Sequence, residues 1–246
     1  MTLSSTPITT NQLTTLKIIY KFRFITVGLL SQYRAISVET SKGTLSSMLK
    51  HGYIERHYDK SYKLLGKPAR YYLTTKSIKL LKDQEGVSEK VLHARYKDAS
   101  VSEDFIQRSL DIFKTALFIR SHYPDKRIIF TRYELAKYDY FPIPHPDLYV
   151  KKVNDDTLGP KAYFLEMVGN DHFFITKKRI NQYIDHLETG EWPHQEYPQV
   201  IFIVQTKGQK KRLREYIEDL VINGHMDENE PEFKVIDNLD MLTNRE

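Results

Sequence analysis

Apolar residues between positions 11 and 82 recur in a pattern that predicts three helices followed by two short strands. The three apolar stripes are Leu13, Leu16, Ile19, Tyr20 and Phe24, then Val27, Leu29, Leu30 and Tyr33, then Leu45, Met48 and Leu49. Gly52 follows the third stripe in the position that commonly ends a helix. A strand comes next, and residues 70–73 return beside it after a turn containing Gly66. This order of elements is typical of a winged helix-turn-helix.

The predicted third helix carries small polar and basic side chains beside its apolar stripe. Such side chains suit a helix that lies in a major groove, while lysines and arginines hold phosphates. We therefore expect base edges to be approached by Thr40, Ser41, Lys42, Thr44 and Ser47. We expect phosphates to be held by Lys50, Lys63, Lys67 and Arg70.

Positive charge is concentrated in the same part of the chain. The net charge is +5, but residues 1–98 hold 17 lysines and arginines against 7 acidic residues, a net of +10. The remaining residues hold 20 against 25, a net of −5. A basic module that also carries a polar recognition helix favours double-stranded DNA as the partner.

The character of the chain changes after residue 82. Residues 83–102 are polar and charged, which predicts a partly helical linker, and a strongly apolar helix then opens at residue 103. Strands are expected at 127–130, 146–150, 162–168, 199–205 and 233–236, a hairpin turn at 154–160, and helical segments at 133–138, 175–187 and 209–220. The continuous apolar run at 199–205 predicts a central strand covered on both faces.

The predicted fold class is therefore α+β, with an N-terminal winged helix and an α/β second domain built on a mixed sheet. The winged helix occupies residues 11–82, the linker 83–102, and the second domain 103–240. Cysteine is absent, which excludes disulfides, thiolate metal sites and cysteine nucleophiles. No apolar run reaches the roughly 20 residues that a membrane span needs, so we expect a cytoplasmic protein without a membrane partner.

Asp147 and Glu166 form the candidate chemical pair. Each lies in or at the end of a predicted strand, and a short turn joins the two strands. In adjacent antiparallel strands their carboxylates would meet and could hold a divalent cation such as magnesium. Metal-dependent nucleases use such ions to polarise a phosphate and activate water.

Six motifs occur in a fixed order along the chain: 69–77 (ARYYLTTKS), 145–148 (HPDL), 163–168 (YFLEMV), 176–183 (TKKRINQY), 192–193 (WP) and 200–213 (VIFIVQTKGQKKRL). Together they resemble the bacterial replication-relaxation family, whose members are linked to plasmid replication and plasmid DNA relaxation. The likeness covers residues 11–216. It implies a second domain similar to the PD-(D/E)XK nuclease fold, with Asp147 and Glu166 at the acidic positions.

The chain departs from that nuclease pattern at Val168, where the third motif residue would be a lysine. A lysine from elsewhere would have to act instead, and the candidates are Lys161, Lys177 and Lys178. If the site is active, Asp147, Glu166 and Lys178 would be catalytic, and the two acids would hold Mg²⁺. The alternative is a degenerate domain in which Glu166 is structural and residues 177–179 form a solvated or phosphate-facing helix surface.

The sequence thus predicts a DNA-binding protein that acts in replication, relaxation or mobilisation of a plasmid-like element. Plasmid replication or mobilisation proteins and a second copy of the chain are its expected protein partners. Two alternatives stay open. One is a divalent-metal-dependent endonuclease that nicks DNA, and the other is a winged-helix transcriptional repressor with a dimerising C-terminal domain.

Overall fold

The computed structural model of the chain describes residues 8–123, 127–153, 161–194, 196–223 and 231–242. It divides into two compact units, Met1–Lys114 and Thr115–Glu246. The turn expected at 154–160 lies outside the described residues. In the ranges that are described, no helix is long and apolar enough to cross a membrane.

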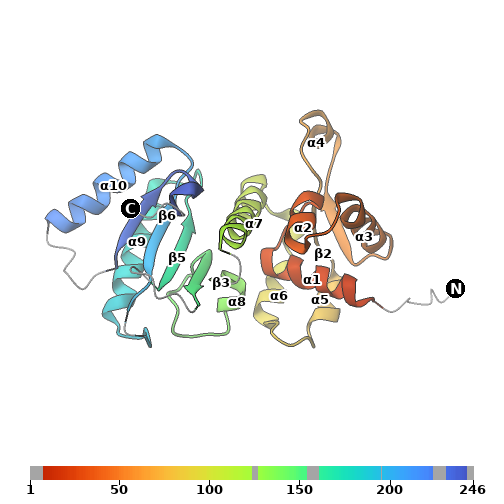
Figure 1. Cartoon of the computed structure of the whole chain (residues 1–246), viewed down its shortest axis with the longest axis horizontal. Helices are drawn as coiled ribbons and strands as arrows, with labels where there is room; N and C mark the ends of the chain where they lie inside the picture. The colour runs from red at the N-terminus through yellow and green to blue at the C-terminus, as the bar shows by residue number, and fades with distance from the viewer. Residues whose placement is uncertain (1–7, 124–126, 154–160, 195, 224–230, 243–246) are drawn as a thin grey trace. The chain divides into compact units, whose positions relative to one another are not determined.

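The first unit has the element order expected of a winged helix. Three helices come first, α1 (Thr10–Phe22), α2 (Val27–Arg34) and α3 (Val38–Lys50). Two antiparallel strands follow, β1 (Ile54–His57) and β2 (Arg70–Leu73), and a bridge from Ile25 to Tyr71 adds a third segment at the other edge of β2. The hairpin between β1 and β2 projects from the helices with the short helix α4 (Lys60–Leu64) at its tip (Figure 1). We call residues 58–69 the wing.

Local signals explain where these helices begin and end. Thr9 and Gln12 form a reciprocal capping box at the start of α1. The Ser37 hydroxyl accepts the Thr40 N–H at 3.0 Å at the start of α3. Gly52 follows that helix with φ +69°, a conformation that favours glycine. The apolar stripes meet in a core whose fully buried members include Leu16, Ile19, Phe24, Leu30, Leu45, Met48 and Ile54.

The expected linker is part of the first unit. It follows the helix α5 (Thr75–Leu81) and contains the helix α6 (Glu89–Arg95) and the 3-10 turn η1 (Asp98–Ser100). Asp98 is fully buried and forms an ion pair of 2.6 Å with Arg23. Arg95 is 1% exposed and donates to the Tyr20 carbonyl at 2.9 Å. The segment is polar in sequence, yet these two charged residues are buried because each has a polar partner on α1 or just after it.

The boundary between the units also differs from the one expected at residue 103. The helix α7 (Glu103–His122) contains it, between Lys114 and Thr115. The Phe113 ring stacks on Phe22 of α1 with centroids 3.9 Å apart, within the first unit. The Thr115 hydroxyl lies 3.8 Å from the Met167 sulfur, within the second. A continuous helix therefore supplies core residues to both units.

The second unit is a five-stranded mixed sheet in the order β3-β4-β5-β6-β7. The strands are β3 (Arg127–Thr131), β4 (Leu148–Lys152), β5 (Ala162–Met167), β6 (Gln199–Ile203) and β7 (Phe233–Ile236). The first two pairings are antiparallel and the last two are parallel. The mixed α+β architecture agrees with the sequence prediction. As its apolar sequence predicted, β6 is an inner strand, paired with β5 on one edge and with β7 on the other.

Helices cover this sheet on both faces. The connecting helices are α8 (Arg132–Leu135), α9 (Phe173–Glu188) and α10 (Lys207–Ile222), followed by the 3-10 turn η2 (Leu239–Leu242). One core cluster joins Ile180 and Tyr183 of α9 and Leu213 of α10 to Phe164 and Val200 of the sheet. The contact of Thr115 with Met167 places the part of α7 that belongs to the second unit against the opposite face, because Met167 is an odd number of residues from Phe164. Burial on both faces explains why β6 is apolar throughout its centre.

Candidate nucleic-acid interface and the acidic pair

The exposed face of α3 lies opposite its buried residues Ser41, Leu45 and Met48. The exposed positions of the helix are Val38, Glu39, Thr40, Lys42, Gly43, Ser46 and Lys50. Thr44 and Ser47 are half-buried, and Gln12 of α1 donates to the Ser47 hydroxyl at 3.4 Å. Thr40, Lys42 and Lys50 therefore reach solvent as expected, whereas Thr44 and Ser47 lie at the edge of that surface.

The expectation for Ser41 is wrong. Its side chain is fully buried, so it cannot approach a base edge. The cause is helical phase, since positions 41, 45 and 48 share one face of a helix. Residue type had suggested a polar surface position, but the spacing to Leu45 determines that the side chain points inward.

Four exposed residues of α3 were not in the predicted set, namely Val38, Glu39, Gly43 and Ser46. Glu39 lies in the first turn, where a negative charge is favoured by the helix dipole. Gly43 is at the middle of the exposed face, and a Cβ built on it would meet nothing within 4 Å. Ser46 completes the strip. The centre of this face is therefore shallow, with Lys50 at its end.

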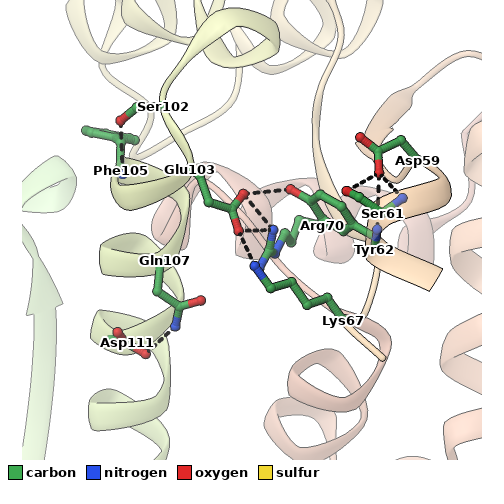
Figure 2. A network of polar contacts seen from close by, with 10 residues as sticks. All are labelled: Asp59, Ser61, Tyr62, Lys67, Arg70, Ser102, Glu103, Phe105, Gln107 and Asp111. Atoms are coloured by element: carbon green, nitrogen blue, oxygen red, sulfur yellow. Dashed lines mark hydrogen bonds and ion pairs between the residues drawn. The ribbon is translucent and has the colours of Figure 1, made fainter. Parts of the chain in front are cut away.

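The carboxylate of Glu103, at the start of α7, holds the wing against the rest of the first unit. Its oxygens accept the Tyr62 hydroxyl at 2.7 Å and lie 2.7 and 2.8 Å from Nη1 of Arg70. Lys67 Nζ approaches the same group at 3.3 Å. Figure 2 shows the three donors converging on Glu103. Burial alone would raise the pKa of Glu103, but the hydrogen bonds from Tyr62 and Arg70 outweigh it and the pKa is lowered.

This network overturns the phosphate role expected for Arg70. Its side chain is only 3% exposed, its guanidinium packs 4.5 Å over the Tyr62 ring, and its charge is paired with Glu103. Lys67 is 41% exposed but shares the same carboxylate. Lys63 is exposed on α4. Of the four expected phosphate ligands, Lys50 and Lys63 are thus the two that present an exposed ammonium outside this network.

Neutralising Glu103 is expected to loosen the wing. Glu103→Gln removes the charge facing Arg70 and should lower the free energy of unfolding by about 1 kcal/mol, because the carboxylate is half exposed and screened. The lowered pKa means that the carboxylate stabilises the fold above its ordinary pKa of 4.5, and that this stabilisation disappears as the pH falls through the lowered value. The difference between wild type and variant in denaturant unfolding should therefore be full at pH 7 and shrink below pH 4.5. Glu85→Gln, which removes one exposed carboxylate elsewhere, should show no such pH-dependent difference.

Asp147 and Glu166 lie opposite each other, as the strand prediction required. The register pairs Leu148 with Leu165 in adjacent antiparallel strands, which brings the next positions, 147 and 166, side by side. Both are buried, at 0% and 4% exposed. The Asp147 carboxylate accepts the Met167 N–H at 2.8 Å and lies 3.0 Å from Nη2 of Arg132.

The partner of Glu166 is Arg179 rather than a lysine. Arg179 Nε and Nη2 lie 2.7 and 2.6 Å from its Oε1, and the Tyr183 hydroxyl donates to the same oxygen at 2.6 Å. Burial alone would lower the pKa of Arg179, but the attraction of Glu166 outweighs it, so the pKa is raised and the charge is retained. Burial also raises the pKa of Tyr183, which keeps its proton to donate. Arg179 is 8% exposed, so it is not part of the solvated surface that residues 177–179 suggested.

The catalytic set expected for an active nuclease is not assembled. Lys178 is exposed one position before Arg179 and points away from the acids, because residues 179 and 183 occupy the face of α9 that meets Glu166. The charge of Glu166 is already paired with Arg179. Within the described ranges, no group of three or more histidine, aspartate or glutamate side chains is arranged to hold a metal ion. In the described structure each acid is paired with an arginine, Asp147 with Arg132 and Glu166 with Arg179.

These features define a winged-helix protein with a second, mixed-sheet unit. No protein-family model matches the chain, and no curated protein sequence matches it, so the resemblance to the replication-relaxation family rests on the sequence motifs alone. Among solved structures, reduced AbfR bound to DNA is similar at 15% identity over 45% of this chain and 72% of that chain, with a TM-score of 0.26. Disulfide-formed AbfR is similar at 16% identity over 47% and 71%, with a TM-score of 0.27. Superpositions of that quality carry no weight for fold or function.

Proposed function

We propose that the chain binds double-stranded DNA, with the exposed face of α3 in the major groove and the wing against the backbone. The proposal depends on one observation. The exposed surface of α3, within a winged-helix unit, carries small and polar side chains and has Lys50 at its C-terminal end. Residues 1–98 of the chain hold 17 basic and 7 acidic residues. Such a surplus supplies the sequence-independent part of DNA affinity through counterion release.

Four exposed residues of α3 have distinct roles in this arrangement. Gly43 and Ser46 add little bulk, so the helix can enter the groove closely. Thr40 and Glu39 lie toward its N-terminus, where recognition helices contact base edges. A glutamate can accept a hydrogen bond from the cytosine amino group, while it is repelled by phosphates. Glu39 therefore contributes to base selection rather than to general affinity.

The wing adds a second contact. Lys63 provides an exposed ammonium, and Leu64 and Leu65 of the same tip are 88% and 66% exposed. Proteins that bind the minor groove insert apolar side chains of this kind between base steps. In this proposal the tip lies at the minor groove beside the site read by α3.

The test is a double substitution of Lys50 on α3 and Lys63 on the wing, both of which are exposed. Lys50→Ala with Lys63→Ala should weaken binding to every duplex roughly tenfold at moderate salt and reduce the slope of log affinity against log salt by about 2, one unit for each phosphate that is no longer neutralised. Fluorescence anisotropy with random and selected duplexes across a salt series measures both quantities. Arg70 is left intact because its replacement would disturb the wing itself.

Lys79→Ala with Lys90→Ala is the matched control, since both lysines are exposed on α5 and α6 and the same number of charges is removed. Its salt slope should stay that of the wild type. If the two double variants showed the same DNA affinity and the same salt slope, the loss of affinity would result from net charge alone. That result would contradict the proposed interface.

The biological role of DNA binding is inferred from the resemblance of the sequence motifs to the replication-relaxation family. We propose that the DNA site belongs to a plasmid-like element, where the protein acts in replication, relaxation or mobilisation. A transcriptional repressor with a dimerising second unit accounts for the same interface. Footprinting across the element on which the protein is encoded separates them, since protection at an origin supports the first role and protection at a promoter supports the second.

A further inference from the structure

A small cavity in the second unit lies beside β4, the start of β5 and the loop that follows α9. Its volume is about 200 Å³. Three aromatic side chains, Tyr149, Trp192 and Tyr197, form walls, and Lys151, Lys161 and Glu196 contribute charged groups. None of these residues belongs to the proposed DNA interface or to the acidic pair.

Hydrogen bonds and ring contacts hold the aromatic side chains of the cavity in place. Trp192 Nε1 donates to the Glu196 carbonyl at 2.9 Å, and the Tyr197 hydroxyl is hydrogen-bonded to Nδ1 of His186 at 2.8 Å. The Trp192 ring meets Tyr197 and Tyr149 edge-on, with centroids 5.8 and 6.1 Å apart. The polar ends of Trp192 and Tyr197 are therefore satisfied, and their rings are available to pack on a ligand.

Tyr149 differs from its neighbours because its hydroxyl has no hydrogen-bond partner among the described residues. The residue is 6% exposed and lines the cavity. Burial raises its pKa to about 12, so the phenol stays protonated and remains a donor at neutral pH. A ligand in the cavity that carries an acceptor atom would give this hydroxyl a hydrogen-bond partner.

Size and charge narrow the class of ligand. A cavity of about 150 Å³ binds benzene, whereas drug-sized ligands occupy about 300–1,000 Å³, so about 200 Å³ suits one six-membered ring with a small substituent. Lys161 lies 3.7 Å from Glu196, which offsets its charge. Lys151 is left as the exposed surplus cation, and an anionic substituent is favoured over a cationic one.

We propose that this cavity binds a monocyclic aromatic carboxylate. The ring packs against Trp192 and Tyr197, and the carboxylate accepts a hydrogen bond from the Tyr149 hydroxyl and faces Lys151. The binding gives the second unit a ligand of its own, independent of whether the first unit binds DNA.

The test uses benzoate and the intact chain. Trp192 is the single tryptophan of the sequence, so its fluorescence reports the cavity directly, and calorimetry gives an independent dissociation constant. Benzoate should bind saturably, and cyclohexanecarboxylate and benzyltrimethylammonium should bind at least fivefold more weakly, because the first lacks the aromatic ring and the second the negative charge. Equal binding of cyclohexanecarboxylate, or no saturable response to benzoate, overturns the proposal. So does saturation by an oligothymidylate without any by benzoate, which would assign the cavity to an unpaired base.

Two substitutions locate the site without endangering the fold. Tyr149→Phe deletes only the unpartnered hydroxyl and should weaken benzoate binding roughly tenfold. Lys151→Ala should weaken it about fivefold, while Lys211→Ala, which removes an exposed lysine from α10, should leave it unchanged. Wild-type affinity in both Tyr149→Phe and Lys151→Ala would overturn the assignment.

Discussion

Replacing Glu166 with alanine is expected to lower the free energy of unfolding of the second unit by about 3–5 kcal/mol. The variant leaves the guanidinium of Arg179 in the core, where the side chain is 9% exposed, without its carboxylate partner. Removing one member of a buried ion pair costs more than the pair contributes, because the remaining charge stays desolvated. Denaturant unfolding followed by Trp192 fluorescence measures the change in this unit.

The double variant Glu166→Leu with Arg179→Met is the control for that result. It removes both charges and fills the space with apolar atoms, so most of the stability should return. A destabilisation of less than about 1 kcal/mol in Glu166→Ala would show that the pair is not structural. If magnesium instead stabilised the wild type and had no effect on Glu166→Ala, that result would support the metal-binding role that the sequence suggested for Glu166.

Replacing Asp98 with alanine is expected to destabilise the first unit by about 3–5 kcal/mol. Asp98 Oδ1 lies 2.6 Å from both Nε and Nη2 of Arg23, whose guanidinium also packs 4.3 Å over the Phe105 ring. Without the carboxylate, Arg23 is left buried beside an aromatic ring. The segment 96–102 would also lose its main polar attachment to α1. Far-ultraviolet circular dichroism during denaturant unfolding follows this largely helical unit.

Asp83→Ala is the matched control, since Asp83 is an exposed aspartate of the segment 83–102, and it should change stability by at most about 0.5 kcal/mol. Burial raises the pKa of Asp98 even though Arg23 opposes the shift. The folded protein therefore holds this proton more tightly than the unfolded chain does. It follows that the stability of wild type relative to Asp98→Asn should rise as the pH falls from neutrality through the raised pKa. A flat difference across that range would contradict a buried Asp98 that titrates with a raised pKa.

Periodicity along the chain was sufficient for much of the architecture. The apolar stripes, Gly52 and the basic turn predicted the helices and the hairpin of the first unit in their observed order. The strand run at 233–236 coincides with β7. The facing positions of Asp147 and Glu166 also followed from two strands joined by a short turn. Each of these features depends on residues that are close in sequence, whose spacing determines which way a side chain points.

The partners of the buried charges were decided by the tertiary structure. Arg70 meets Glu103 across 33 positions, and Arg23 meets Asp98 across 75. Sequence reasoning assigned such residues to the surface because an isolated charge is costly to bury. A charged side chain can be buried when a residue from a distant segment pairs with it in the folded protein. The spacing of residues along the chain does not identify that partner. The cavity around Trp192 has the same origin, since strands and a loop far apart in sequence supply its walls.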